Sequence, residues 1–371
     1  MRDIEQDFVS LARLALSGQT RDALLLIRRS LSDLAKRRPE LATELGELLA
    51  GRGVPTRANA PPEPIPVDLD SRLELLRRDD HPVMPVVPTW LDSISKELTQ
   101  ILLERSQLDR LNAAGVLPTR SLLFVGPPGV GKSLAARYLA SEMGRPLLTL
   151  DLAAVMSSFL GRTGNNIRTV LEFARRKPSI LLLDEFDAIA KRRDDSAEIG
   201  ELKRLVTVLL QAIDDWPSHG ILIAATNHPD LLDPAVWRRF ERILRFELPG
   251  FKEIRNAVNI ALQDDQQNVS SETITLLAAL LIGQSFADID RIITTARRES
   301  VISQVPLFQI IEQRNAILTE KLNHPQKIEL AVLMYKEGFT QHDASKITGV
   351  SRDTIRSRSE AQESNAQMTE V

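Results

Sequence analysis

The chain reads GPPGVGKS from Gly126 to Ser133, and this stretch decides its fold. It matches the pattern G-x-x-x-x-G-K-S/T, follows an apolar run at residues 121–125 and opens a helix-like segment at 132–143. Glycines let successive backbone N–H groups curl around a phosphate chain, and the N-terminus of a helix adds partial positive charge. The stretch therefore predicts a site for a nucleoside triphosphate.

Two side chains of this stretch add chemistry to that of the backbone. Lys132 is expected to reach the β- and γ-phosphates, and the Ser133 hydroxyl is expected to ligate Mg²⁺. The predicted nucleotide-binding residues are Gly126, Pro127, Pro128, Gly129, Val130, Gly131, Lys132, Ser133 and Leu134.

Short β-rich runs alternate with amphipathic helices on both sides of this loop. The expected strands cover residues 121–125, 147–151, 180–183, 221–225 and 243–246. Such alternation is typical of a mostly parallel sheet with helices on both faces, so we expect the α/β class. Strand signals disappear after residue 250, and residues 250–322 predict about four helices.

Composition excludes several functional classes. The chain has no cysteine, which excludes disulfides, thiolate metal sites and cysteine nucleophiles. Its net charge of −3 argues against a surface that grips nucleic acid by bulk electrostatics alone. The N-terminus is too charged for a signal peptide, and the longest apolar run, residues 276–282, is too short to span a bilayer. We expect a cytoplasmic protein with no membrane contact.

Changes in composition along the chain predict its domains. Apolar residues keep helical spacing up to residue 50, and a run rich in glycine and proline follows. We expect a helical domain at 1–50, a Pro-rich linker at 51–84, an α/β domain at 85–249, an all-α domain at 250–322, a helix-turn-helix at 325–360 and a disordered tail at 361–371.

Two adjacent carboxylates end the apolar run at residues 180–183. Asp184 is expected to hold Mg²⁺ through water, and Glu185 to polarise an attacking water as a general base. An apolar run followed by Asp-Glu is by itself also typical of a strand-ending turn. Its distance from the upstream glycine loop favours the catalytic interpretation.

Asn227 and an arginine pair complete the candidate constellation. Asn227 follows the expected strand 221–225 and could orient the attacking water, although a turn or capping role is the commoner one for a lone asparagine. Arg238 and Arg239 could be a solvated basic pair, or could project into a neighbouring subunit's nucleotide site. There a cation would stabilise charge that develops on the transferred phosphoryl group.

In this order, these features resemble a single AAA-type ATPase module over about residues 85–322. The segment Gly283-Gln284-Ser285-Phe286-Ala287-Asp288-Ile289 is similar to the family's G-x-S-x-A-D-I/L stretch, which lies near the nucleotide. The resemblance implies ATP and Mg²⁺ as cofactors, a helical lid, and a self-assembled ring, usually a hexamer, with shared sites. It implies catalytic roles for Lys132, Glu185, Asn227, Arg238 and Arg239, metal roles for Ser133 and Asp184, and nucleotide contact for Asp288. The contiguous arginines depart from members that space the two apart.

A further match concerns what such a ring acts on. Protein-unfolding members carry an aromatic-hydrophobic-glycine triplet on a loop that lines the pore, and Phe159, Leu160 and Gly161 fit it. An exposed aromatic can grip an extended polypeptide through apolar contact. The alternative is that Phe159 packs into the core. Arg162 and Thr163 stand where acidic residues are usual, which leaves the polarity of the substrate open.

The C-terminal segment 341–356 is similar to the helix-turn-helix of resolvase-type recombinases. We expect Thr340 and Ser351 to cap its two helices and Gly349 to form the turn. The predicted DNA contacts are Arg352, Thr354, Arg356 and Arg358. Acidic residues nearly neutralise the unit, so a protein-docking role is the alternative.

The leading functional hypothesis is a ring ATPase that remodels, unfolds or activates a protein partner. The alternative is a DNA-associated ATPase in transposition, replication or transcription regulation, and a third hypothesis is a nucleotide-dependent scaffold. The module is also similar to bacterial ATPases found beside a subtilisin-like protease in defence or toxin–antitoxin pairs, which implies such a protease as a partner.

Overall fold

The computed structural model describes residues 65–67, 74–84, 88–152, 155, 163–188, 199–262 and 269–369. The chain divides into two units, Met1–Pro64 and Ile65–Val371, and all described residues belong to the second. The predicted N-terminal helical domain and the pore-loop residues Phe159, Leu160 and Gly161 lie outside the described ranges. Within those ranges, no helix has both the length and the apolar character needed to cross a bilayer.

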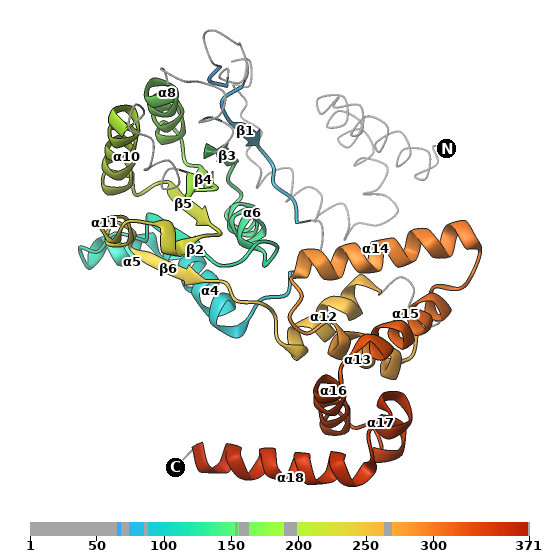
Figure 1. Cartoon of the computed structure of the whole chain (residues 1–371). Coiled ribbons are helices and arrows are strands. Elements are labelled where there is room, and N and C mark those ends of the chain that lie inside the picture. The colour runs from blue at the N-terminus through green and yellow to red at the C-terminus, as the bar shows by residue number, and fades with distance from the viewer. Residues whose placement is uncertain are drawn as a thin grey trace, which may run out of the picture. The chain divides into compact units, whose positions relative to one another are not determined.

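A six-stranded sheet, in the order β1-β3-β4-β5-β2-β6, forms the centre of the α/β part (Figure 1). All pairs are parallel except β1 with β3. The strands are β1 (Arg77–Asp79), β2 (Ser121–Val125), β3 (Leu147–Asp151), β4 (Ile180–Asp184), β5 (Ile221–Thr226) and β6 (Arg242–Arg245). The expected α/β class with a mostly parallel sheet is confirmed.

Strand β1 was not predicted, because residues 77–79 fall in the segment assigned to the linker 51–84. It pairs antiparallel with β3 at the edge of the sheet, with Arg77 opposite Thr149. Buried Leu75 and Leu76 precede it and pack into the core. A strand of three charged residues, Arg-Arg-Asp, is too short to show an apolar alternation, so its sequence carries no strand signal.

Helices cover both faces of the sheet, as expected (Figure 1). On one face, Leu181 and Leu183 of β4 pack in a core with α8 (Thr163–Arg175) and α10 (Ile199–Asp214). On the other, Ile180 and Leu182 pack with α4 (Asp92–Ser106) and α6 (Lys132–Glu142). Shorter elements are α5 (Leu108–Ala113), η1 (Pro229–Leu231) and α11 (Pro234–Trp237).

The four expected helices after residue 250 form a unit with its own apolar core, the lid. They are α12 (Phe251–Ala261), α13 (Ser271–Leu280), α14 (Phe286–Ser303) and α15 (Leu307–Lys321). Ser285 caps α14, with Asp288 completing a reciprocal capping box. The cap fixes where α14 begins, and this end of the helix faces the glycine loop.

Three C-terminal helices follow: α16 (His324–Lys336), α17 (Gln341–Thr348) and α18 (Arg352–Thr369). The predicted caps are confirmed, since Thr340 accepts from the Asp343 N–H and Ser351 from the Thr354 N–H, and Gly349 has a φ of 73°. The core of this unit includes Ala279 of α13 and so continues into the lid.

Helix α18 continues to Thr369, into the segment 361–371 that was expected to be a disordered tail. The tail has no apolar periodicity, which is why the sequence indicated disorder. A helix that has already formed needs little further support to extend through good helix formers such as Ala361 and Gln362.

Candidate nucleotide-binding site

The carboxyl ends of β2, β4 and β5 border a cleft of about 950 Å³. Nine predicted site residues line it: Pro128, Gly129, Gly131, Lys132, Ser133, Leu134, Asp184, Glu185 and Asn227. The lid contributes Ala257, Ile260, Phe286 and Ala287 from the opposite side. Val130, predicted as a nucleotide contact, is 2% exposed and packs into the core beneath the loop. Gly126 and Pro127, at the start of the loop, do not line the cleft either.

Two glycines of the loop are required by their surroundings. Gly126 has a φ of 151°, and a Cβ there would collide with the backbone of Phe246. Gly129 has a φ of 77°, and its Cβ would lie 2.5 Å from Ser285 Oγ. The loop can therefore approach both the end of β6 and the lid only without side chains at these positions.

Lys132 is buried at the first position of α6, with 7% of its surface exposed. Its Nζ donates to Gly126 O at 2.7 Å, to Pro127 O at 2.8 Å and to Asn227 Oδ1 at 2.7 Å. Burial lowers the pKa of Lys132 to about 8, although Asp184 and Asp187 favour the charged form. All three ammonium donors are engaged, so an arriving phosphate must take over at least one.

Ser133 and Asp184 face each other across the cleft floor. The Ser133 hydroxyl donates to Asp184 Oδ2 at 3.1 Å, and Asp184 Oδ1 accepts from the Glu185 N–H at 3.0 Å. A hydroxyl and a carboxylate are hard oxygen donors, the class that Mg²⁺ prefers. The pair therefore fits the predicted metal role.

Glu185 follows Asp184 in a left-handed backbone conformation, with a φ of 52°. This conformation is uncommon outside glycine, and such strain is found at functional sites. The side chain is exposed and has no hydrogen-bond or ion-pair partner among the described residues. Its carboxylate is therefore free to accept a proton from water in the cleft.

Two buried polar residues that the sequence analysis missed hold this arrangement in place. Thr226, fully buried at the end of β5, donates from Oγ1 to Asp187 Oδ1 at 3.1 Å and accepts from the His228 N–H at 3.0 Å. Asp187 is 3% exposed. The link ties the turn after β4 to the turn after β5, and so fixes the spacing of Glu185 and Asn227. The only available signal was polar residues directly after two buried strands.

The lid contacts the loop through the start of α14. The Ala287 N–H donates to Gly129 O at 3.1 Å. Asp288, predicted to contact nucleotide, does not line the cleft. Its carboxylate accepts from Ser285 Oγ at 2.7 Å and from Arg291 at 2.6 Å, and the Ser285 hydrogen bond lowers its pKa. In this structure the Asp288 side chain caps the helix that reaches the loop, and its contact with nucleotide stays a prediction.

Trp90 is another cleft residue without a sequence signal. Its ring lies 3.0 Å from where a Cβ on Gly131 would stand, and its centroid is 6.1 Å from that of Tyr138. Trp90 lines the cleft together with lid residues such as Ile260. It therefore offers an apolar surface beside the phosphate-binding loop.

With this geometry in place, sequence comparisons identify the family. The model described as "ATPase family associated with various cellular activities (AAA)" matches residues 122–248. The chain is 37% identical over 243 residues to an "Uncharacterized AAA family ATPase y4kL" of Sinorhizobium fredii, covering 64% of this chain and 71% of that protein. The chain belongs to the AAA ATPase family. As a member of this family it is an ATP hydrolase.

This AAA ATPase is also similar to proteins named proteasome-activating nucleotidase. It is 33% identical over 235 residues to that of Methanococcus vannielii, covering 61% of this chain and 54% of the relative. It is 30% identical over 253 residues to that of Thermococcus onnurineus, covering 65% and 62%. The AAA ATPase thus spans between half and two thirds of the length of these two relatives.

The arginine pair of the AAA ATPase lies outside the cleft, between α11 and β6. Both side chains are exposed, but their environments differ. Arg239 forms an ion pair with Asp214 at the end of α10. Arg238 has no hydrogen-bond or ion-pair partner in the described part of the chain. In the single subunit, Arg239 is therefore paired, while the Arg238 side chain remains available to another group.

The predicted DNA contacts all lie on α18 of the AAA ATPase. Arg352, Arg356 and Arg358 are exposed. Arg356 donates to Glu360 at 3.0 Å, which offsets part of its charge. The Thr354 hydroxyl is 2.7 Å from Ser351 Oγ, within the helix cap. Thr354 is therefore engaged within the cap and Arg356 with Glu360, while Arg352 and Arg358 are exposed without such a contact in the described part of the chain.

Proposed function

We propose that the chain assembles into a ring, with six subunits as the expected number, in which each nucleotide is held by one subunit and completed by the next. The observation that supports this proposal best is that the arginine pair lies apart from the other predicted catalytic residues. One cleft gathers Lys132, Ser133, Asp184, Glu185 and Asn227, while the arginine pair lies outside it and is exposed. A cation placed there serves a neighbour's phosphate rather than the subunit's own.

Within one site, each side chain has a defined task. Lys132 shifts a donor from its loop carbonyls to the β- and γ-phosphates. Glu185 accepts a proton from the attacking water, and Asn227 orients that water. Ser133 and Asp184 would hold Mg²⁺, which would supply charge neutralisation at the phosphates.

ATP hydrolysis is coupled to work on a protein partner, which the ring remodels, unfolds or activates. Similarity to proteins named proteasome-activating nucleotidase supports a protein substrate. Phe159, Leu160 and Gly161 would contact an extended chain in the ring's pore. A separate subtilisin-like protease is the specific partner we propose, because of the module's overall similarity to ATPases encoded beside one.

A trapping experiment tests this proposal. Glu185→Gln should bind ATP without hydrolysing it and should retain the partner on affinity purification in ATP, with the Lys132→Ala variant as the control that cannot form the ATP state. Phe159→Ala should keep ATPase turnover and lose remodelling of the trapped partner. Equal partner recovery with Glu185→Gln and Lys132→Ala would contradict an ATP-dependent complex. Full remodelling by Phe159→Ala would contradict the proposed contact of Phe159 with the substrate.

The geometry of α17 and α18 supports DNA as a second candidate partner. The capped helices flank a tight turn at Gly349, and three exposed arginines lie on α18. Binding of the full chain to duplex DNA should weaken steeply as salt rises, and Arg352→Ala should reduce the slope by about one unit. Salt-independent or undetectable binding at low salt would remove this candidate.

A further inference from the structure

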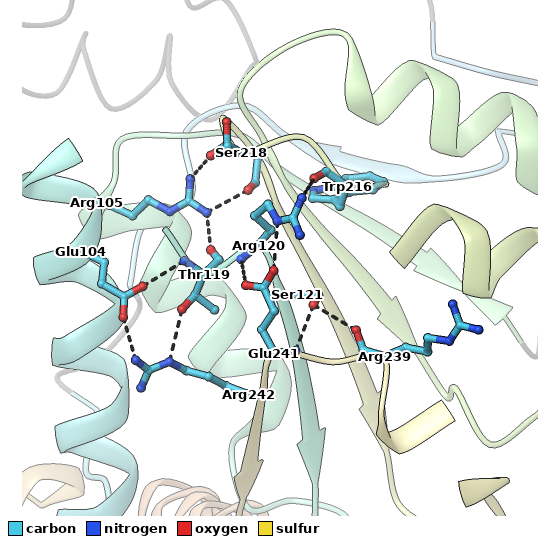
Figure 2. A network of polar contacts seen from close by, with 11 residues as sticks. Glu104, Arg105, Thr119, Arg120, Ser121, Trp216, Ser218, Arg239, Glu241 and Arg242 are labelled. Carbon is cyan, nitrogen blue, oxygen red and sulfur yellow. Dashed lines mark hydrogen bonds and ion pairs between the residues drawn. The ribbon is translucent and has the colours of Figure 1, made fainter. Parts of the chain in front are cut away.

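A polar network surrounds the chain just after the arginine pair, at the amino ends of β2 and β6 (Figure 2). The Glu241 carboxylate accepts from the Arg120 N–H at 2.8 Å and from Arg120 Nε at 2.9 Å. The Glu241 N–H donates to Ser121 Oγ at 3.1 Å. Ser121 is 1% exposed. The side chain of Glu241 is thus tied to Arg120, just before β2, and its backbone to Ser121, the first residue of β2.

Arg239, two residues before Glu241, is held in place as well. The Ser121 hydroxyl lies 3.5 Å from Arg239 O, and the Arg239 side chain pairs with Asp214 (Figure 2 shows the Ser121 contact). The backbone and the side chain of Arg239 are therefore engaged by two different elements. Arg238 is left as the exposed cation of the pair, without a partner in the described ranges.

An aromatic contact fixes the segment from a third side. Phe240, 7% exposed, packs edge-on against Phe186, with ring centroids 6.0 Å apart at 81°. Phe186 directly follows Glu185, the proposed general base. The segment that presents the arginine is therefore packed against the turn that carries Glu185, the subunit's own proposed general base.

We propose that Ser121 and Glu241, with Arg120 pairing to Glu241, are positioning residues that hold Arg238 for the nucleotide of the neighbouring subunit. This inference rests on the proposed shared site. Misplacement of a reacting or stabilising group by about 1 Å can cost about 100-fold in rate. The contacts of Arg239, Phe240 and Glu241 limit the displacement of the four-residue segment 238–241. A basic pair that was only solvated at the surface would not need such contacts.

Steady-state kinetics distinguish a positioning role of Ser121 and Glu241 from a purely structural one. Glu241→Ala and Ser121→Ala should lower kcat about 10- to 100-fold, because the arginine offered to the neighbour is displaced. KM for ATP should stay unchanged, because the cleft of the same subunit does not contain these residues. The matched control is Glu299→Ala, which removes another partly exposed carboxylate, 2.7 Å from Arg314 in the lid, and should leave kcat unchanged.

Mixed rings identify the site on which Glu241 acts. Glu185→Gln subunits cannot hydrolyse ATP but present an intact arginine. Glu241→Ala subunits keep an intact cleft. Mixing the two should restore turnover above the sum of the separate variants, because each Glu241→Ala cleft then meets a well-placed arginine. The same gain is expected for Ser121→Ala, and a misfolded variant could not show it.

The outcomes separate the inference from the proposed function. A mixture of Arg238→Ala with Glu185→Gln tests the shared site itself. If this mixture gains activity but the Glu241→Ala and Ser121→Ala mixtures do not, the positioning role is overturned and the shared site stands. If none gains activity, the shared site fails and the inference fails with it. Unchanged kcat in Glu241→Ala alone would also overturn it.

Discussion

Raising the pH above 8 should weaken ATP use by this enzyme through one group, Lys132. Its ammonium is 7% exposed, and burial lowers its pKa to about 8. With that pKa, about nine tenths of the unliganded protein carries the charge at pH 7 and about one tenth at pH 9. Only the charged form attracts the phosphates, so kcat/KM for ATP should fall about tenfold between these two pH values. Each further pH unit should lower kcat/KM about tenfold again, which corresponds to about 1.4 kcal/mol.

Stability should change in the opposite direction over the same range. The folded-state pKa of Lys132, about 8, lies below its ordinary value of 10.5. Between these values the unfolded chain binds more protons than the folded one, so this lysine makes the free energy of unfolding rise with pH. Its penalty is fully present below pH 8 and is lost as the pH approaches 10.5. Falling kcat/KM with rising stability would separate this titration from alkaline unfolding.

The assay is steady-state ATPase kinetics from pH 6.5 to 10, with thermal unfolding followed in parallel. Lys132→Arg keeps its charge throughout this range, so its kcat/KM should lack the alkaline fall even if its absolute value is low. Lys96→Arg, at an exposed position on α4, should match the unmodified protein. A flat profile between pH 7 and 9.5 would refute the reasoning, and so would an identical fall in Lys132→Arg.

Three further predictions follow from contacts around the site. Thr226→Val removes the hydrogen bond to Asp187 within a buried pair and should lower the free energy of unfolding by about 2–3 kcal/mol, measured by denaturant titration; an unchanged midpoint would contradict it. Gly126→Ala should abolish nucleotide binding in a fluorescent-ATP titration, because its Cβ meets backbone; near-normal affinity would show that the loop can move. Arg238→Ala should lower kcat about 1,000-fold and Arg239→Ala less, because Arg239 starts paired within its own subunit; equal losses would contradict this difference.

Local signals in the sequence predicted most of the sheet and the core of the site. The loop from Gly126 to Ser133 identifies its own strand and helix, and a buried apolar run ending in Asp184 identifies a second strand that ends at the cleft. Helix caps such as Thr340 were equally predictable, because the capping residue and its partner lie three positions apart.

Features that depend on distant segments could not be predicted this way. Trp90 meets Gly131 only because the segment before α4 folds back over the loop. Strand β1 is too short and charged to show a period, yet its pairing with β3 places it in the sheet. Asp288 illustrates a different limit: an acid at the start of a helix suits both a ligand and a cap, and only the structure shows its hydrogen bonds to Ser285 and Arg291.

The central claim is that hydrolysis requires a neighbouring subunit, and the dependence of turnover on assembly tests it most directly. ATPase activity per subunit should be measured across a dilution series alongside the mass of the assembly in solution. We predict that turnover per subunit rises steeply as monomers give way to rings and stays low in the monomer. A monomer that hydrolyses ATP at the full rate of the assembled protein would contradict the account.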